Sequence, residues 1–148
     1  MTQREALEKM AKYCAYQERC QFEVRQKLFG EGFTDDEIEN IICDLIEQNF
    51  IDEERFARAF VRGKFRQKRW GKIKIKQHLK QKQISDYCIR KGFEEISNEE
   101  YFEQLELVIS KKSSSLTEAN DFIKKQKVAK FALSRGFENN LIWEILGD

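Results

Sequence analysis

A pattern of apolar and helix-capping residues that recurs three times constrains the fold of this chain more than any other sequence feature. The second copy follows the first after 51 residues, and the third follows the second after 53. The matching positions are Val24, Leu28, Phe33, Thr34, Asp35, Ile38 and Ile42, then Ile75, Leu79, Ile84, Ser85, Asp86, Ile89 and Phe93, and finally Val128, Ala132, Phe137, Glu138, Asn139, Ile142 and Leu146. Repetition at a nearly fixed spacing is typical of repeat architectures, in which each unit packs mainly on its neighbours. We therefore expect tandem units that form an elongated, curved modular array.

Each unit is predicted to be helical. Apolar residues recur at helical spacing through most of the chain, and Thr34 with Glu37 three residues later forms a capping box, which is a typical helix start. The sequence contains no proline and 41% hydrophobic residues, so helices are not interrupted and a core can form. The predicted fold class is all-α, with three tandem three-helix repeats.

The repeat boundaries are predicted at 1–50, 51–96 and 97–148, and the middle repeat is the cationic one. The third repeat departs from the shared spacing, because the polar run 111–115 displaces its first helix. Clusters of polar residues between apolar segments are typical of surface loops. We therefore expect a loop rich in Lys and Ser near 111–120.

Charge is distributed very unevenly along the chain, although the formal net charge is only +1. Residues 1–54 carry a net charge of −8, residues 55–85 one of +12, and residues 86–148 one of −3. The middle segment contains twelve Lys or Arg and not one Asp or Glu. Such a concentrated positive field is typical of proteins that bind nucleic acids or acidic protein surfaces.

Five arginines are predicted to share one face of a helix in this segment. They are Arg55, Arg58, Arg62, Arg66 and Arg69. At about 100° per residue they fall within roughly 80° of arc, opposite the apolar side of the helix. Like charges one turn apart destabilise a helix, so the stripe indicates an anionic partner, and arginine suits phosphate or carboxylate groups. The alternative is internal pairing with acids of the preceding repeat, for which the candidates are Asp36, Glu37, Glu39, Asp44 and Glu47.

The next predicted helix, 71–83, is also purely cationic. Its basic side chains flank a buried stripe, with Lys72, Lys76 and Lys80 on one side and Lys74, His78 and Lys82 on the other. Trp70 precedes this helix, and its ring either stacks on bases beside the cations or packs in the core between helices. His78, the only histidine, is expected to be a polar surface residue. The third repeat has basic residues at equivalent positions, which are Lys124, Lys125, Lys127 and Lys130.

Several classes of function are disfavoured by the sequence. The cysteines, Cys14, Cys20, Cys43 and Cys88, show no CxxC spacing, so we expect reduced thiols and neither a metal site nor a cofactor. We recognise no phosphate-binding loop, nucleophile elbow or Cys–His pair, so we do not expect an enzyme. No apolar run approaches the ~18 residues of a membrane span, and residues 1–11 lack the apolar stretch of a signal peptide. We expect a cytoplasmic monomer that does not bind membranes.

Two segments resemble the RecX family, the bacterial regulators of the RecA recombinase. Residues 51–61, IDEERFARAFV, resemble the most recognisable motif of that family. Residues 69–84, RWGKIKIKQHLKQKQI, resemble its glycine-led basic helix. The resemblance is strongest over residues 50–90 and weaker on either side. The chain departs from the family pattern at Gln83, where a glycine is usual, and at Lys72, where a proline is common.

The resemblance implies a non-enzymatic modulator that lies along the groove of the RecA–DNA filament. Such proteins restrain strand exchange, ATP hydrolysis and coprotease activity, and so act in DNA repair and the SOS response. The implied partners are the RecA filament and single- or double-stranded DNA, bound directly or through the filament. Two alternatives remain, a stand-alone helical nucleic-acid-binding module and a repeat scaffold for acidic protein partners.

The predicted contacts act by electrostatic docking rather than by chemistry. The principal ones are Arg55, Arg58, Arg62, Arg66, Lys72, Lys74 and Lys76, and the further ones are Arg69, Trp70, Lys80, Lys82, Lys124, Lys125 and Lys127. This hypothesis depends on basic side chains that point outward and that are not neutralised by the chain's own acids.

Overall fold

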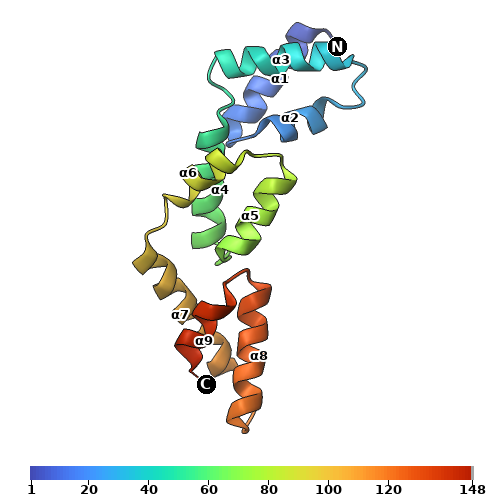
Figure 1. Ribbon diagram of the computed structural model, residues 1–148. Coiled ribbons are helices and arrows are strands. Elements are labelled where there is room, and N and C mark those ends of the chain that lie inside the picture. The colour runs from blue at the N-terminus through green and yellow to red at the C-terminus, as the bar shows by residue number, and fades with distance from the viewer. Residues whose placement is uncertain (148) are drawn as a thin grey trace. The chain divides into compact units, whose positions relative to one another are not determined.

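The computed structural model describes residues 1–147, and within them the chain forms nine α-helices and no strand (Figure 1). The helices are α1 (Gln3–Tyr16), α2 (Gln21–Leu28), α3 (Asp35–Glu47), α4 (Glu53–Arg66), α5 (Lys72–Gln81), α6 (Asp86–Phe93), α7 (Asn98–Ser115), α8 (Asp121–Ser134) and α9 (Asn139–Leu146). The predicted all-α class is therefore confirmed. No helix in this described part is both long enough and apolar enough to cross a membrane.

Packing divides the chain into two compact units. The first unit comprises Met1–Ala59 and Leu79–Gly92, and the second comprises Phe60–His78 and Phe93–Asp148. Helices α4 and α5 each contribute residues to both units, so this division differs from the division into sequence repeats. The repeat boundaries therefore stay a prediction.

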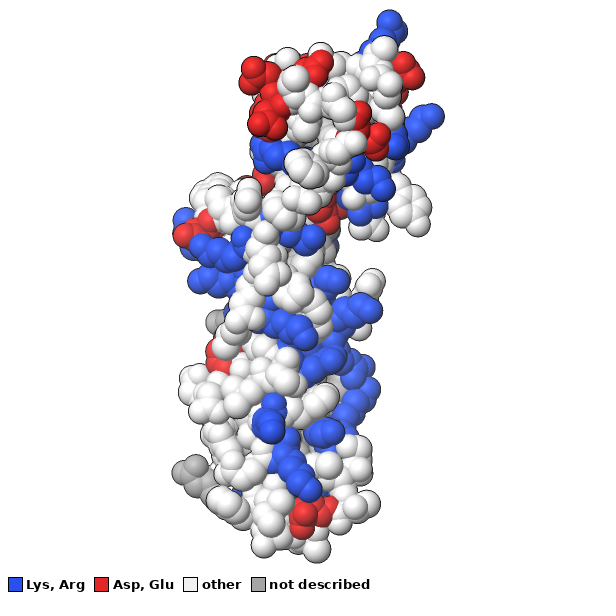
Figure 2. All heavy atoms as spheres, turned by 90° about the vertical axis from the view of Figure 1, so that its right-hand side faces the viewer, with Lys and Arg blue, Asp and Glu red and all other residues white. Residues whose placement is uncertain are grey.

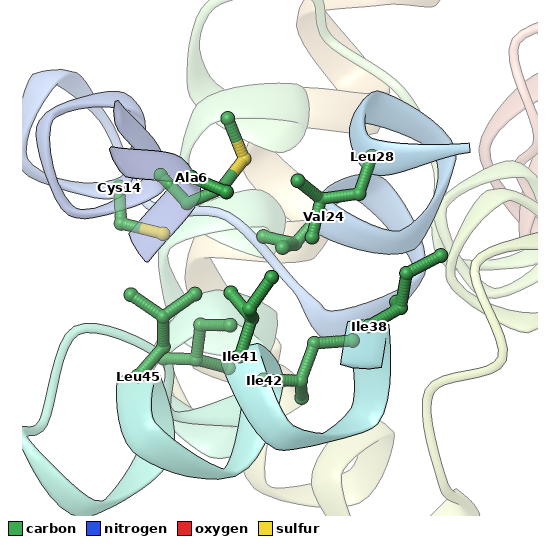
Figure 3. Packing of buried hydrophobic residues seen from close by; sticks show 10 residues of the cluster. Ala6, Cys14, Val24, Leu28, Ile38, Ile41, Ile42 and Leu45 are labelled. Carbon is green, nitrogen blue, oxygen red and sulfur yellow. The ribbon is translucent and has the colours of Figure 1, made fainter. Parts of the chain in front are cut away.

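The apolar repeat positions form a buried cluster in the first unit. Its side chains are Ala6, Met10 and Cys14 from α1, Val24 and Leu28 from α2, Ile38, Ile41, Ile42 and Leu45 from α3, and Ile51 after α3. Figure 3 shows them converging from the three helices. Burial raises the pKa of Cys14 to about 11 and that of Cys20 to about 12. Both thiols therefore stay protonated and unreactive at neutral pH.

Helix α3 begins with the capping box that the sequence predicts. Thr34 Oγ1 accepts a hydrogen bond from the Glu37 backbone N–H at 3.2 Å, and Glu37 Oε1 accepts one from the Thr34 backbone N–H at 2.8 Å. The second hydrogen bond lowers the pKa of Glu37, because it stabilises the carboxylate. The pair satisfies two of the N–H groups that a helix start leaves without partners.

The loop expected near 111–120 is shorter than predicted. Residues 111–115 form the last turn of α7, and Leu116 is the first residue outside that helix. The prediction was wrong for these residues because α8 packs against this turn. The Lys112 ammonium lies 4.7 Å from the centroid of the Phe131 ring on α8. The polar side chains of residues 111–115 therefore lie on a helix that packs against α8.

Gln83 has a left-handed backbone conformation. At the equivalent positions of the other two repeats, the residue with this conformation is a glycine. The φ of Gln83 is 61°, whereas Gly32 has a φ of 90° and Gly136 one of 96°. A side chain in this region strains the backbone by about 1–2 kcal/mol, and glycine does not. The departure from the family pattern at Gln83 is therefore a strained position.

Replacing Gln83 with glycine is expected to raise the free energy of unfolding by about 0.5–1 kcal/mol, because relief of strain exceeds the added entropy of the unfolded chain. Urea denaturation followed by circular dichroism measures this change. Gln81→Gly, at the end of α5, is the control and is expected to lower stability by up to about 1 kcal/mol. A Gln83→Gly protein no more stable than the wild type would contradict the prediction.

In the second unit, Tyr101 of α7 joins the starts of two other helices. Its hydroxyl accepts a hydrogen bond from the backbone N–H of Lys72 at 2.9 Å and donates one to Glu138 Oε1 at 2.5 Å. Lys72 is the first residue of α5, and Glu138 occupies the N-cap position of α9. Burial and the Glu138 carboxylate raise the pKa of Tyr101, so the hydroxyl remains a donor. Its ring also stacks on Phe65 at 5.8 Å between centroids.

The start of α5 also meets the chain that follows α8, at a contact between two glycines. The Gly71 N–H donates to the Arg135 carbonyl at 2.7 Å, and the Ile73 N–H donates to the Gly136 carbonyl at 3.0 Å. A β-carbon added to Gly71 would lie 2.3 Å from the Gly136 carbonyl oxygen, far inside van der Waals contact. Only glycine at position 71 permits this approach, which fixes the start of α5 within the second unit.

Candidate nucleic-acid interface

The first arginine of the α4 stripe is held by the chain itself. Arg55 Nε donates to Glu18 Oε2 at 2.7 Å, and Nη1 donates to Asn49 Oδ1 at 3.2 Å. Its Nη2 donates to the carbonyl oxygens of Asn49 and Phe50 at 3.1 and 3.3 Å. The guanidinium thus ties the turn after α1 to the turn after α3, and it is a structural group.

Three further arginines of the stripe are also paired with carboxylates. Arg58 Nε lies 3.1 Å from Glu54 Oε2. In the second unit, Arg62 Nη1 lies 2.7 Å from Glu95 Oε1. Arg66 Nε lies 3.0 Å from Glu100 Oε2, and this carboxylate raises the pKa of Arg66.

The expectation that these arginines are not neutralised by the chain is therefore wrong. These arginines pair with acids of the same chain, as the alternative hypothesis expected. Their partners differ from the acids that were proposed from the sequence. Those acids lie on α3, where Glu39 pairs with Arg25 instead. Glu54 lies one turn before Arg58 on α4 itself. The partners of Arg55, Arg62 and Arg66 lie far away in the sequence, and only the tertiary fold brings them to α4.

Replacing Arg55 with glutamine is expected to lower the free energy of unfolding by about 2 kcal/mol, because the half-buried Glu18 and two backbone carbonyls lose their donor. Arg4→Gln is the matched control. Arg4 and Glu8 lie 3.7 Å apart with side chains 89% and 68% exposed, so a loss below about 0.5 kcal/mol is expected. Urea denaturation compares the two, and equal small effects would mean that Arg55 is not structural.

The lysines of α5 divide into a paired and an unpaired group. Lys80 pairs with Asp86, and Lys82 Nζ lies 3.0 Å from Glu23 Oε2. Lys72, Lys74 and Lys76, in the first two turns of the helix, form no ion pair with any described residue. The expected docking charge therefore concentrates at the start of α5.

Trp70 lies among these cations and is half-buried rather than enclosed in the core. The Lys74 ammonium lies 4.6 Å from the Trp70 ring centroid, and that of Lys64 lies 5.0 Å from it. The His78 ring packs against the indole with 4.5 Å between centroids. His78, which was expected to be a polar surface residue, is half-buried. An aromatic ring flanked by cations is the arrangement that stacks on bases and attracts phosphates.

The predicted lysines of α8 lie in its first half. Lys125 Nζ is 3.5 Å from Asp121 Oδ2, and Lys127 Nζ is 3.5 Å from Glu118 Oε2. Lys124, in the same turn, forms no ion pair within the described residues. At about 1.5 Å per residue, Lys124 lies on the order of 18 Å along the helix axis from Gly136. Gly136 is the residue at which the start of α5 meets the segment after α8.

Other basic residues of the second unit lie nearer to α5, and sequence reasoning did not select them. They are Lys64 of α4, Lys68 in the turn before Arg69, Lys111 and Lys112 at the end of α7, and Arg135 after α8. The Arg135 guanidinium donates to the Lys68 carbonyl, which holds it beside that turn. Lys64 and Lys68 belong to the acid-free segment 55–85 but were not singled out within it, and the Lys111–Lys112 pair indicated a loop.

We define the basic surface as the residues of the second unit that carry a positive charge and form no ion pair within residues 1–147. They are Lys64, Lys68, Arg69, Lys72, Lys74, Lys76, Lys111, Lys112, Lys124, Lys130 and Arg135. Figure 2 shows a face on which Lys and Arg spheres gather over α5 and α8 with few Asp or Glu among them. This surface is suited to a polyanion, because the protein's own acids do not neutralise it.

Family comparison covers most of the chain. Models of RecX match in three places, as the first three-helix domain at residues 6–45, the second at 52–92 and the third at 99–146. The predicted grouping of the helices in threes is confirmed by these matches.

Curated relatives named Regulatory protein RecX are similar over most of the chain. The protein of Haemophilus ducreyi is 35% identical over 121 residues, which are 80% of this chain and 76% of the relative. That of Prosthecochloris aestuarii is 27% identical over 145 residues, 98% of this chain and 93% of the relative. That of Halalkalibacterium halodurans is 29% identical over 136 residues, 92% of this chain and 51% of the relative. The chain thus spans about half the length of some relatives that it matches.

Two crystal structures of RecX proteins have the same fold. One, described as regulatory protein RecX, superposes with a TM-score of 0.87 at 25% identity and covers 97% of this chain and 72% of the other. The RecX protein of Lactobacillus salivarius superposes with a TM-score of 0.86 at 24% identity and covers 97% of this chain and 94% of the other.

Proposed function

This chain belongs to the RecX family of regulatory proteins, and from that membership we propose that it binds the RecA–DNA filament and lowers RecA activity without catalysing a reaction. The observation that carries the proposal is the basic surface of the second unit. A RecA–DNA filament is a polyanion that presents phosphates along its length, and charges without internal partners are the ones that such a ligand attracts. The protein acts in the cytoplasm, where RecA and DNA are found.

The proposed contacts fall into two classes. Lys72, Lys74 and Lys76 form the primary contacts, because no acid of the described chain competes for them. The arginines of α4 form secondary contacts. The ion pair of Arg66 is exposed and therefore weak, so a phosphate can replace its carboxylate. Arg55 is left out of this interface, because four hydrogen bonds already occupy it.

RecA ATP hydrolysis on single-stranded DNA, titrated with this protein, tests the proposal. The expected result is a progressive loss of ATP turnover that begins at substoichiometric amounts, because a protein that caps or destabilises filaments acts on many RecA subunits at once. The same assay without RecA controls for interference with the detection system. Unchanged turnover at equimolar protein would exclude the proposed regulation.

Direct binding to nucleic acid is a second candidate function, and the cations around Trp70 favour it. If the basic surface neutralises about five phosphates of a single strand, log K falls with log salt at a slope near −3.5. Fluorescence anisotropy of a labelled oligonucleotide in the absence of RecA measures that slope. A flat response would indicate that the docking surface recognises RecA rather than DNA.

A further inference from the structure

A hollow lined by cations lies in the second unit, between the end of α7, the end of α8 and the turn after α4. Its volume is about 260 Å³. Helices α7 and α8 pack side by side and supply most of its wall (Figure 1). Four basic residues line it, namely Arg69, Lys111, Lys112 and Arg135, and no carboxylate does.

The fold holds these four charges together. The Arg135 guanidinium donates to the Lys68 carbonyl and lies 5.7 Å from the Phe131 ring centroid. Arg69 has a φ of 57°, a left-handed conformation within the turn that leads from α4 to α5. No ion pair joins any of the four to an acid within residues 1–147. Because like charges repel, a cluster of this kind is stabilised by an anion that the chain does not supply.

One wall of the hollow is apolar. Phe131 is half-buried and lines the hollow with its ring, next to the buried Val108. Lys112 and Arg135 flank that ring at 4.7 and 5.7 Å from its centroid. An aromatic face beside guanidinium and ammonium groups is suited to a ligand that joins a planar ring to a phosphate, and nucleotides have this composition.

The size of the hollow selects among nucleic acids. Its volume of about 260 Å³ lies just below the range of about 300–1,000 Å³ typical of sites for small molecules, which limits a bound nucleic acid to about one nucleotide. Bases of a duplex are stacked and paired, whereas those of a single strand can turn outward onto an aromatic side chain. The hollow therefore favours a single strand over a duplex.

We propose that this hollow binds one nucleotide of a single strand, with the phosphate held by Arg69, Lys111 and Arg135 and the base stacked on Phe131. The inference refines the proposed function. It rests on that function only in that the bound single strand comes from a RecA–DNA filament. It names a second nucleic-acid contact beside α5, on α7 and α8.

Binding of a fluorescently labelled oligothymidylate, compared with a labelled duplex in the absence of RecA, tests the inference. Phe131→Leu keeps apolar bulk and removes the ring, so affinity for the single strand is expected to fall at least about fivefold, with little change for the duplex. Phe131→Tyr keeps the ring and is expected to bind like the wild type. Phe29→Leu, at an exposed phenylalanine of the first unit, is the control for loss of an aromatic ring.

The phosphate contact has its own variant. Lys111→Gln is expected to weaken single-strand binding and to flatten the salt slope by about 0.7, whereas Lys12→Gln, an exposed lysine of α1, is expected to change neither. Circular dichroism verifies that each variant is folded.

Three outcomes would overturn the inference. The first is equal losses for single strand and duplex, and the second is a Phe131→Leu protein that binds like the wild type. The third is thymidine monophosphate binding as tightly as the oligonucleotide, which would assign the site to a free nucleotide. If Lys111→Gln weakens binding and Phe131→Leu does not, the hollow contacts a phosphate but no base. RecA ATPase assays are independent of all these measurements, so failure of the inference leaves the proposed function standing, and the reverse also holds.

Discussion

Replacing Gly71 with alanine is expected to lower the free energy of unfolding by about 4 kcal/mol, which is a large fraction of the stability of an ordinary domain. The new β-carbon would lie 2.3 Å from the carbonyl oxygen of Gly136 and 2.5 Å from the backbone nitrogen of Phe137. Both are backbone atoms, so no side-chain rotation relieves the clash. The start of α5 must move away, and the backbone hydrogen bonds from Gly71 and Ile73 are lost with the contact.

Gly63→Ala is the matched control for this variant. Gly63 lies inside α4, and a β-carbon there meets no atom within 4 Å. Alanine is expected to stabilise the protein by about 0.5–1 kcal/mol at that position, because glycine is unfavourable within a helix. Urea denaturation compares the two variants, and hydrogen exchange at the Ile73 amide locates the effect. A Gly71→Ala protein as stable as the wild type would mean that α5 is not tied to Gly136.

The helices were predictable because their signals are local. The capping box at Thr34 and the apolar spacing of α1 to α3 act over one or two turns, and the structure keeps them. Gly32 and Gly136 are left-handed in the structure, in agreement with their repeated place before a phenylalanine. Gln83 shares that conformation although its residue type does not indicate it. Repetition was therefore a better guide there than the residue itself.

The candidate site was predictable in its charge but not in its contacts. The sequence places an acid-free cationic segment at 55–85, and the basic surface draws on it. Pairing of Arg62 with Glu95 and of Arg66 with Glu100 joins residues 33 and 34 apart, and only the tertiary fold sets such distances. Lys111 and Lys112 were not predicted as contacts for the same reason. Their stretch has a polar, loop-like composition, but packing against α8 extends α7 through it.

A double charge reversal, Lys74→Glu with Lys76→Glu, is expected to reduce affinity for single-stranded DNA at least about tenfold at 0.1 M salt. If each lysine neutralises one phosphate, the salt slope also becomes shallower by about 1.4. Both side chains belong to the basic surface and form no ion pair in the described chain, so the loss reflects the ligand rather than an internal contact. Anisotropy of a labelled oligonucleotide measures the affinity, and the RecA ATPase titration measures the effect on inhibition.

Lys9→Glu with Lys12→Glu is the control, because it makes the same change in net charge on α1 of the first unit. It is expected to leave affinity within about twofold of the wild type, since neither lysine belongs to the basic surface and salt screens charges that do not contact the ligand. Equal losses in the two variants would show that net charge, and not the start of α5, determines binding. Unchanged binding but weaker RecA inhibition by the α5 variant would instead place Lys74 and Lys76 against RecA itself.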